Sequence, residues 1–408
     1  MGQFQNIFID LIARAFGLVY VFIILVAPFL LGRIFFNAFV TYKRNKFIHA
    51  QKSVLLEVRI PKEIFKSPLA MELFLTSLYQ TKGEGTWWAR NIDGKVRPWF
   101  SLEMVSFGGD IRFFIWTWKF WKPLVESQLY AQYPEVEIKE VEDYAKDIHL
   151  DTNHNDLWGC HFQLSKGGYF PIKTYTDYKL NEDPKEELKI DPITPVLEYL
   201  GSLLPGEIAA IQILVRAHKK ETVNPTSKWY KKELVDWTHA AGEEIKKIKE
   251  KTKGKEDAAP NVGSLSKGDK DVIEGIERNI SKLPFDVGIA AFYFAPKDKF
   301  NDINIAGLTG SFRQYNSTFL NSFATTHAVG FDYKWQDWSG KKTKKQKEHI
   351  LHGYQERAFF HKPHQGHFFT MSTEGIATIY HFPGQVAKTP TMTRIEAKRA
   401  EPPANLPI

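Results

Sequence analysis

The chain has 408 residues, of which 43% are hydrophobic, a share that allows a globular body of two or three domains. Its 54 basic and 47 acidic residues leave a net charge of +7, which is too mild for this length to indicate nucleic-acid binding by itself. Cys160 is the single cysteine, so an intramolecular disulfide is excluded.

The N-terminal 50 residues carry the clearest pattern. Residues 16–31 (FGLVYVFIILVAPFLL) have no charge, and the apolar sequence continues to Val40 with Arg33 as its one charge. This stretch reaches the roughly 20 residues that a helix needs to cross the hydrocarbon core of a bilayer. Arg33 would cost about 3 kcal/mol at mid-bilayer, but the large apolar residues together contribute roughly −4 to −5 kcal/mol. We therefore predict a transmembrane anchor made by Phe16, Leu18, Val21, Phe22, Ile24, Phe29, Leu31 and Arg33.

A cleaved signal peptide is the alternative interpretation of this segment. The apolar run is long for a signal peptide, and no small-residue cleavage site follows it. The flanking charges are asymmetric, because Arg14 precedes the run whereas Lys43, Arg44, Lys46 and Lys52 follow it. The positive-inside rule then predicts a single-pass protein of the inner (plasma) membrane with its C-terminal body in the cytoplasm.

Residues 51–150 have the pattern of a small α/β module. Alternation predicts a strand at 53–60, two apolar runs predict strands at 98–107 and 111–118, and a short strand is expected at 135–141. Gly108–Gly109–Asp110 predicts a tight turn between the second and third of them. Helical spacing predicts two helices, at 67–78 and 120–132. The resulting order β-α-β-β-α-β is that of a ferredoxin-like module.

Residues 151–383 predict a second, looser copy of this order. The expected strands lie at 159–165, 206–217, 285–295 and 366–371, and the expected helices lie at 193–203 and 302–313. Residues 219–283 form an insertion between the two central strands. The insertion is expected to contain two charged helical stretches. Residues 254–270, between these stretches, carry few apolar groups and are expected to be mobile.

The C-terminal tail, residues 384–408, is rich in proline, which excludes a long helix or a central strand. We expect it to be an extended strap along the body or an arm for a partner. The predicted fold class is therefore α+β, with an N-terminal transmembrane helix, two ferredoxin-like modules, a charged helical insertion and a proline-rich strap.

Three long runs of sequence resemble one known family. They begin with SLEMVSFGGDIRFFIWTW, LEYLGSLLPGEIAAIQILVRA and TEGIATIYHFPGQVAKTPTM, and the resemblance covers roughly residues 54–218 and 283–408. The family is an uncharacterised domain of bacterial conjugation-like systems, found before or beside ATPases of the HerA–FtsK type that are related to type IV secretion motors. In fused relatives the proline-rich run leads into a Walker A loop, whereas this sequence ends at Ile408. The resemblance therefore implies a standalone, membrane-anchored version whose motor is a separate ATPase.

No nucleotide site is evident in the sequence. A P-loop needs G-x-x-x-x-G-K-[ST], and the closest strings, GSLSKGDK (263–270) and LTGSFRQ (308–314), have no Gly-Lys-Ser/Thr triplet. We expect no enzyme activity, no catalytic residue and no cofactor. An enzyme acting at the membrane surface is nevertheless the first alternative, with a candidate cluster of His352, His361, His364, His367, Glu374 and His381. We expect no metal there, because Pro363 and Gly366 break regular structure and no cysteine is near.

Two lysine-rich stretches define a second alternative, a nucleic-acid-guiding protein. They are residues 246–255 and 341–347, the latter just after Trp335 and Trp338. Acidic neighbours dilute the second stretch, and lysine runs are usually solvated loops. We therefore do not expect nucleic acid as a specific ligand, and anionic lipid is another potential ligand for the lysines.

Residues 111–118 are apolar on both alternating faces, although the two helices of a ferredoxin-like module cover one face alone. The other face would be covered by the second module or by a partner. We predict a membrane-anchored scaffold or docking subunit that binds the bilayer, a separate ATPase of the HerA–FtsK type and potentially further copies of itself. The candidate partner contacts are Trp116, Trp118, Pro402, Pro403, Leu406 and Pro407.

Overall fold

The computed structural model of the chain describes residues 2–61, 66–182, 190–219, 222–223, 234–235, 237–251, 265–331 and 333–384. The predicted contacts Pro402, Pro403, Leu406 and Pro407 lie outside the described residues. The chain forms two compact units. The first comprises residues 1–51 and 82–96, and the second comprises residues 52–81 and 97–408.

The first unit is built on α1 (Gly2–Ala50), a continuous helix of 49 residues with Pro28 inside it. At 1.5 Å per residue it is about 73 Å long, more than twice the thickness of a hydrocarbon core. The stretch Ile24–Ala50 is long and apolar enough to cross a membrane, a criterion that a signal sequence near an N-terminus would also meet.

A short segment, residues 82–96, completes the first unit and was not foreseen from the sequence. It contains α3 (Trp87–Asn91), which is capped by the Thr86 side chain accepting a hydrogen bond from the Ala89 amide. The Trp87 ring stacks on Phe36 of α1 with 6.1 Å between the ring centroids. The segment therefore packs against the second half of α1.

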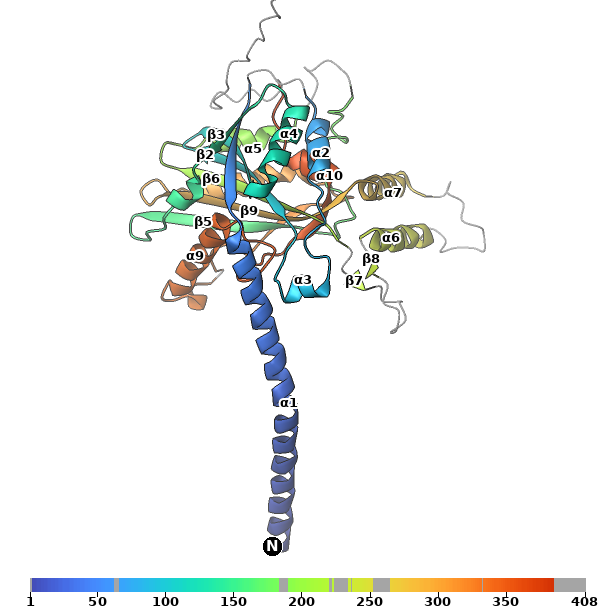
Figure 1. Cartoon of the computed structure of the whole chain (residues 1–408), viewed down its shortest axis with the longest axis vertical. Coiled ribbons are helices and arrows are strands. Elements are labelled where there is room, and N and C mark those ends of the chain that lie inside the picture. Colours follow the sequence, from blue (N-terminus) through green and yellow to red (C-terminus); the bar gives the residue numbers. More distant parts are fainter. Residues whose placement is uncertain are drawn as a thin grey trace, which may run out of the picture. The chain divides into compact units, whose positions relative to one another are not determined.

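The second unit is organised around one antiparallel sheet of nine strands (Figure 1). Its strand order is β10-β5-β9-β6-β2-β3-β1-β4, and β11 pairs with β9. The strands are β1 (Ser53–Arg59), β2 (Trp99–Phe107), β3 (Asp110–Trp118), β4 (Glu137–Val141), β5 (Asn155–Leu164), β6 (Ile208–Ala217), β9 (Pro284–Pro296), β10 (Phe323–Thr326) and β11 (Phe369–Ser372). A separate two-stranded ribbon pairs β7 (Thr222–Val223) with β8 (Leu234–Val235).

The two halves of the chain contribute the same strand order. With β11 set aside, the outer strand of each half follows the other three in sequence, as in β4-β1-β3-β2 and β10-β5-β9-β6. The halves join through β2 and β6, which pair antiparallel from Trp99↔Arg216 to Phe107↔Ile208. Because this seam is hydrogen-bonded along its length, one sheet runs through both halves.

Most predicted elements form close to their expected positions. The turn at Gly108–Gly109 is confirmed, since β2 and β3 pair up to Phe107↔Asp110 and both glycines have positive φ, at 60° and 96°. The stretch expected at 366–371 does form a strand, β11, but it pairs with β9 instead of closing the second half. The outer position beside β5 is taken by β10, whose four residues (FATT) are too few to show a period.

Helices cover the sheet on one face (Figure 1). Alternate strand residues, such as Leu56, Leu102, Ile115 and Ile213, enter a core shared with these helices. The covering helices are α2 (Pro68–Ser77), α4 (Lys122–Gln132), α5 (Thr194–Gly201), α8 (Asp302–Gly310) and α10 (Thr373–Ile379). Helix α2 begins after Ser67 with Pro68 in its first turn, close to the start expected at residue 67.

The opposite face of the sheet is covered by the chain around α9 (Lys341–Gln355). A side chain at Gly159 of β5 would come within 2.8 Å of Ile350 of α9, which places this helix against that face. Short 3-10 turns flank the layers, at Lys119–Trp121, Tyr144–Asp147, Ser311–Tyr315 and Lys334–Gln336. The lysine run 341–347 forms the first turns of α9, whereas the sequence analysis assigned it to a loop.

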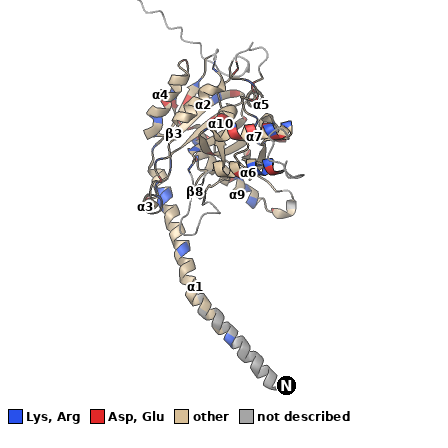
Figure 2. Ribbon diagram, turned by 90° about the vertical axis from the view of Figure 1, so that its right-hand side faces the viewer, with Lys and Arg blue, Asp and Glu red and all other residues tan. Residues whose placement is uncertain are grey.

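The predicted insertion contains two helices, α6 (Trp237–Lys251) and α7 (Lys267–Ile280), packed on each other through Ala241, Ile248, Ile273 and Ile276. Figure 2 shows both blue (Lys, Arg) and red (Asp, Glu) positions along the ribbon of both helices, as expected for solvated faces. The stretch expected to be mobile, 254–270, lies largely outside the described residues.

Candidate functional site

The apolar surface of α1 has little cover from the rest of the described chain, since 6% of the apolar window within Ile24–Ala50 is buried. Large apolar side chains stay exposed along it, including Phe22 at 65%, Phe29 at 79% and Leu31 at 65%. Burying such a side chain is worth about 1.5–3 kcal/mol, so this helix leaves a large apolar area without cover. In Figure 2 the coloured part of α1 is a tan ribbon with a few blue positions.

The predicted anchor residues fall on this surface where their side chains are described. Phe22, Ile24, Phe29, Leu31 and Arg33 are all exposed. The remaining anchor residues, Phe16, Leu18 and Val21, lie on α1 but outside the residues whose side chains are described.

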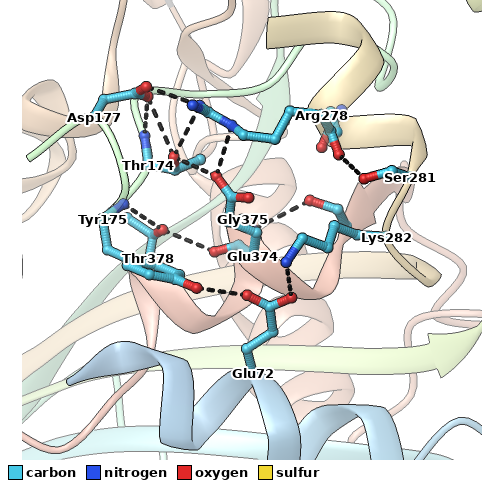
Figure 3. Close-up of polar contacts among 12 residues, drawn as sticks. Glu72, Thr174, Tyr175, Asp177, Arg278, Ser281, Lys282, Glu374, Gly375 and Thr378 are labelled. Atoms are coloured by element: carbon cyan, nitrogen blue, oxygen red, sulfur yellow. Dashed lines mark hydrogen bonds and ion pairs between the residues drawn. The ribbon is translucent and has the colours of Figure 1, made fainter. Parts of the chain in front are cut away.

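Three clusters of buried charge in the described part of the body join segments that are far apart in the sequence. The first one holds α7 to the sheet-covering helices (Figure 3). Glu72 of α2 accepts hydrogen bonds from the Tyr175 hydroxyl at 2.6 Å and from the Thr373 hydroxyl at 3.2 Å. Lys282, just after α7, lies 2.8 Å from the same carboxylate. Burial, followed by the hydrogen bond to Glu72, raises the pKa of Tyr175, so its hydroxyl stays a donor.

Arg278 of α7 makes the second half of this cluster. Its Nη2 donates to Asp177 at 2.8 Å, and its Nε lies 3.2 Å from the Glu374 carboxylate of α10, a charge contact without hydrogen-bond geometry. Glu374 also accepts a hydrogen bond from Thr174 at 2.6 Å. Burial opposes the charge of Arg278, but Asp177 and Glu374 outweigh it and raise the pKa of the guanidinium. Each carboxylate is neutralised by a neighbouring base, so the cluster acts as a clamp between α2, α7, α10 and the loop at 174–177.

The second cluster lies on the α9-covered face of the sheet. Glu103 of β2 forms a bidentate pair with Arg357, with Nε–Oε1 at 3.0 Å and Nη2–Oε2 at 3.2 Å. Tyr144 donates to Glu103 at 2.6 Å, and its hydroxyl contacts that of Tyr354. Burial opposes ionisation of Glu103, but Arg357 outweighs it and lowers the pKa of this carboxyl.

The third cluster surrounds Asp286 of β9 on the same face. Arg216 of β6 donates to its carboxylate through Nε at 3.1 Å and Nη2 at 2.7 Å. His218 Nδ1 lies 2.6 Å from the other oxygen. Burial would raise the pKa of Asp286, but His218 and Arg216 outweigh it and lower that pKa. Arg216 also stacks over the Phe360 ring, at 4.4 Å from its centroid, so this cluster fixes the covering chain to the sheet.

The residues of the membrane-enzyme alternative do not share one site in the described contacts. His352 Nδ1 lies 2.8 Å from His364 Nε2, and His349 packs on His364. Glu374 belongs to the Arg278 clamp, and His381 pairs with buried Asp191 at 3.0 Å. His361 packs beside Trp99, and His367 is exposed. Within the described part of the chain, no group of three or more His, Cys, Asp or Glu residues is arranged to hold a metal ion.

The predicted contacts Trp116 and Trp118 are buried, at 7% and 6% exposure. Trp99 packs against both indoles and Phe360 packs against Trp99, so the chain after α9 covers this aromatic face. A partner would reach these two tryptophans only if that cover moved, and the contact role stays a prediction.

The two lysine stretches carry internal ion pairs. On α6, Lys246 and Lys247 lie 3.2 and 3.3 Å from Glu243 and Glu244. On α9, Lys347 pairs with Asp156 of β5. Lys341, Lys342, Lys344 and Lys345 are exposed, as are Trp335 at 69% and Trp338 at 89%.

Sequence reasoning missed the buried pairs. The one local signal was a charged residue at a strand position with apolar neighbours, as for Glu103 within WFSLEMVSF. Its partner Arg357 lies 254 residues away, and no pattern in the sequence links the two.

Comparison with known proteins identifies one family. A search of curated proteins finds no match. The family model described as a domain of unknown function (DUF8128) matches residues 41–394, which is most of the chain and begins within α1. The chain therefore belongs to the DUF8128 family.

Proposed function

We propose that this protein is a membrane-anchored scaffold that holds its α/β body at the surface of a bilayer. The observation that carries the proposal is the exposed apolar surface of α1, with Phe29 at 79% and Phe35 at 72% exposure. Between Arg14 and Lys43 the helix has Arg33 as its single charged residue. In water this apolar surface would favour aggregation, whereas insertion of the helix into lipid removes the surface from water at a gain in free energy.

The proposed orientation places the body on the cytoplasmic side of the inner membrane. Basic residues cluster at the C-terminal end of the apolar stretch, at Lys43, Arg44 and Lys46, whereas Arg14 is alone at the other end. This charge asymmetry supports the proposed orientation. Retention of α1 has a separate support, because no signal-peptidase cleavage motif separates the helix from the body.

The body is proposed to consist of two ferredoxin-like modules fused side by side. The support is the repeated strand order, β4-β1-β3-β2 in the first half and β10-β5-β9-β6 in the second. Fusion through β2 and β6 removes one free edge from each module, which limits edge-to-edge aggregation.

The docking role is the part of the proposal that rests on resemblance. A separate ATPase of the HerA–FtsK type, in a conjugation or type IV secretion-like assembly, is the proposed partner. A body fixed at the membrane would raise the local concentration of that ATPase, or of further copies of this chain, without new contacts. In the three clusters described above, the buried charges are paired with one another and serve packing, which suits a scaffold better than a catalyst.

Membrane fractionation of the full chain tests the anchor. We expect the protein to sediment with membranes and to resist alkaline carbonate, and a triple substitution of Phe22, Phe29 and Ile34 by Asp to release it. Phe120, exposed at 81% in the body, provides the matched control, and its substitution by Asp should leave the protein in the membrane. Intact mass separates anchor from signal sequence, since a processed chain would lack α1. A soluble full-length chain, or a processed one, would overturn the anchor.

Detergent pull-down tests the docking role. The full chain and a variant lacking residues 384–408 are each tagged and recovered from a host that carries the neighbouring genes. Recovery of an ATPase with the full chain, and weaker recovery with the variant, is the expected result. If neither form recovers an ATPase although both remain in the membrane, the docking proposal fails while the anchor stands.

One observation favours a second candidate function, binding of single-stranded nucleic acid. Tyr333 and Trp335 stack at 6.2 Å and are exposed, and Trp338 and the exposed lysines at the start of α9 follow them. Substituting Lys344 and Lys345 by Glu should then weaken binding of a fluorescent oligonucleotide, and the salt dependence should become shallower. Absence of binding by the unchanged protein at low salt would remove this candidate.

A further inference from the structure

The segment 82–96 is held tightly against α1. Gly94 has φ +70°, and a side chain there would come within 2.4 Å of the Lys43 backbone, so main chain meets main chain at this point. At the other end of the segment, Trp87 stacks on Phe36 with the ring planes 10° apart. Two contacts seven residues apart along α1, at Phe36 and Lys43, therefore fix the orientation of the segment.

This fixed segment presents two large indoles outward. Trp87 is 56% exposed although one face packs on Phe36, and Trp88 is 62% exposed. The helix α3 that carries them is closed by the Thr86 cap and by hydrogen bonds from the Ile92 and Lys95 amides to Trp88 and Ala89 carbonyls, at 2.8 and 2.9 Å. These bonds pair the amides of Ala89, Ile92 and Lys95 within the segment, which lowers the cost of placing α3 in a less polar layer.

The level at which these indoles lie is set by α1. Phe36 belongs to the last apolar turns of the helix, and Lys43 is the first basic residue after them. Seven residues of helix separate the two by about 10 Å, comparable with the depth of an interfacial layer. Trp87 and Trp88 therefore lie where the apolar stretch gives way to charge.

We infer that residues 82–96 are a second membrane contact, with Trp87 and Trp88 inserted in the headgroup layer beside α1. Tryptophan is enriched at membrane–water interfaces, where its apolar ring and its N–H group are both satisfied. Arg90 belongs to the segment and Lys43 lies beside Gly94, and both complement anionic headgroups, at about 1 kcal/mol per basic residue near the surface. The inference rests on the proposed membrane anchor and adds a rigid wedge that would fix the rotation of α1 about its axis.

A fluorophore attached at chosen cysteines of the full chain tests this contact. Cys160 is buried and burial raises the pKa of its thiol to about 12, so the native cysteine does not compete for the label. A polarity-sensitive dye is placed at Trp88→Cys, at Phe29→Cys inside the apolar stretch, and at Phe319→Cys, an exposed position of the body. Gly85→Cys supplies a second labelling site in the segment, because a side chain there meets nothing within 4 Å. This second variant keeps both tryptophans, so its result does not depend on the loss of an indole.

Each labelled protein is reconstituted into vesicles of plain lipid and of lipid brominated near the headgroup. We expect the labels at positions 88 and 85 to lose most of their emission in the brominated vesicles, the label at 29 to be quenched as well, and the label at 319 to be unaffected. Quenching at 29 without quenching at 88 or 85 would overturn the interfacial contact and leave the anchor standing. Quenching at none of the sites would overturn the anchor itself and the contact with it.

Discussion

Glu103 and Arg357 form a bidentate ion pair in which neither side chain is accessible to water, although 254 residues separate them in the sequence. The pair joins β2, a strand of the central seam, to the chain that follows α9. Arg357 adopts φ +48°, a backbone conformation that costs a non-glycine residue about 1 kcal/mol or more. The buried pair therefore holds a strained residue in place and, with it, the cover over Trp99, Trp116 and Trp118.

Breaking this pair should destabilise the body strongly. Arg357→Met leaves Glu103 buried without its counter-charge, and the expected loss is about 3–5 kcal/mol of unfolding free energy. The double variant with Glu103→Gln should lose less than the sum of the two single losses, because no lone charge stays buried. Chemical unfolding of the detergent-solubilised chain measures this difference.

The matched control for that experiment is Arg112→Met, which removes a half-exposed arginine paired with Asp110 at 2.8 Å. A surface pair of this kind contributes about 0–1 kcal/mol. Equal losses for Arg112→Met and Arg357→Met would contradict the special role of the buried pair.

Acid should destabilise the protein through His161 of β5. Burial, together with the charges of His327 and His349, lowers the pKa of His161 to about 4, against about 6.5 in the unfolded chain. Between these two values the unfolded chain binds more protons than the folded one, so stability falls as the pH drops from about 6.5 to about 4.

Replacing His161 by Phe removes this titration and should flatten the pH dependence of stability in that window. The ring of Phe359, at 4.8 Å from that of His161, would accept the aromatic substitute. The effect has an upper bound of about 3 kcal/mol. Thermal unfolding from pH 7 to pH 4 measures it, with exposed His367→Phe as the control, and an unchanged slope in H161F would argue against it.

The Arg278 clamp should determine how firmly α7 is held to the body. Arg278→Leu removes the contacts with Asp177 and Glu374 and leaves a buried carboxylate with fewer partners. Hydrogen exchange in Lys267–Ile280 should then accelerate while exchange in β6 and β9 is unchanged. Exposed Arg313→Leu serves as the comparison, and faster exchange in both variants would mean that the clamp is not what holds α7.

Docking of the segment 82–96 on α1 should depend on Gly94. An alanine there would meet the Lys43 backbone at 2.4 Å and would also sit at a positive φ, so the segment must shift. Gly85→Ala is the matched control, because its side chain would meet open space. Proteolysis in detergent should cut 82–96 faster in G94A than in G85A, and equal rates would contradict the close packing.

The sequence by itself determined the local elements of this protein. The apolar run of α1, the apolar strands β1 to β3 and the Gly108–Gly109 turn each follow from interactions between near neighbours. The insertion between β6 and β9 is also predictable from the sequence, because its charged composition contrasts with the buried strands on either side.

Only the tertiary structure decided which distant residues meet. The partners of Glu103, Glu72 and Asp286 come from other segments, and β10 occupies the outer position that the later stretch, now β11, was expected to take. The docking of Trp87 on Phe36 likewise has no local signature, since α3 spans five residues. These arrangements depend on the free energy of burying whole surfaces together. Local sequence patterns do not predict which surfaces meet, because that free energy depends on residues that are far apart in the sequence.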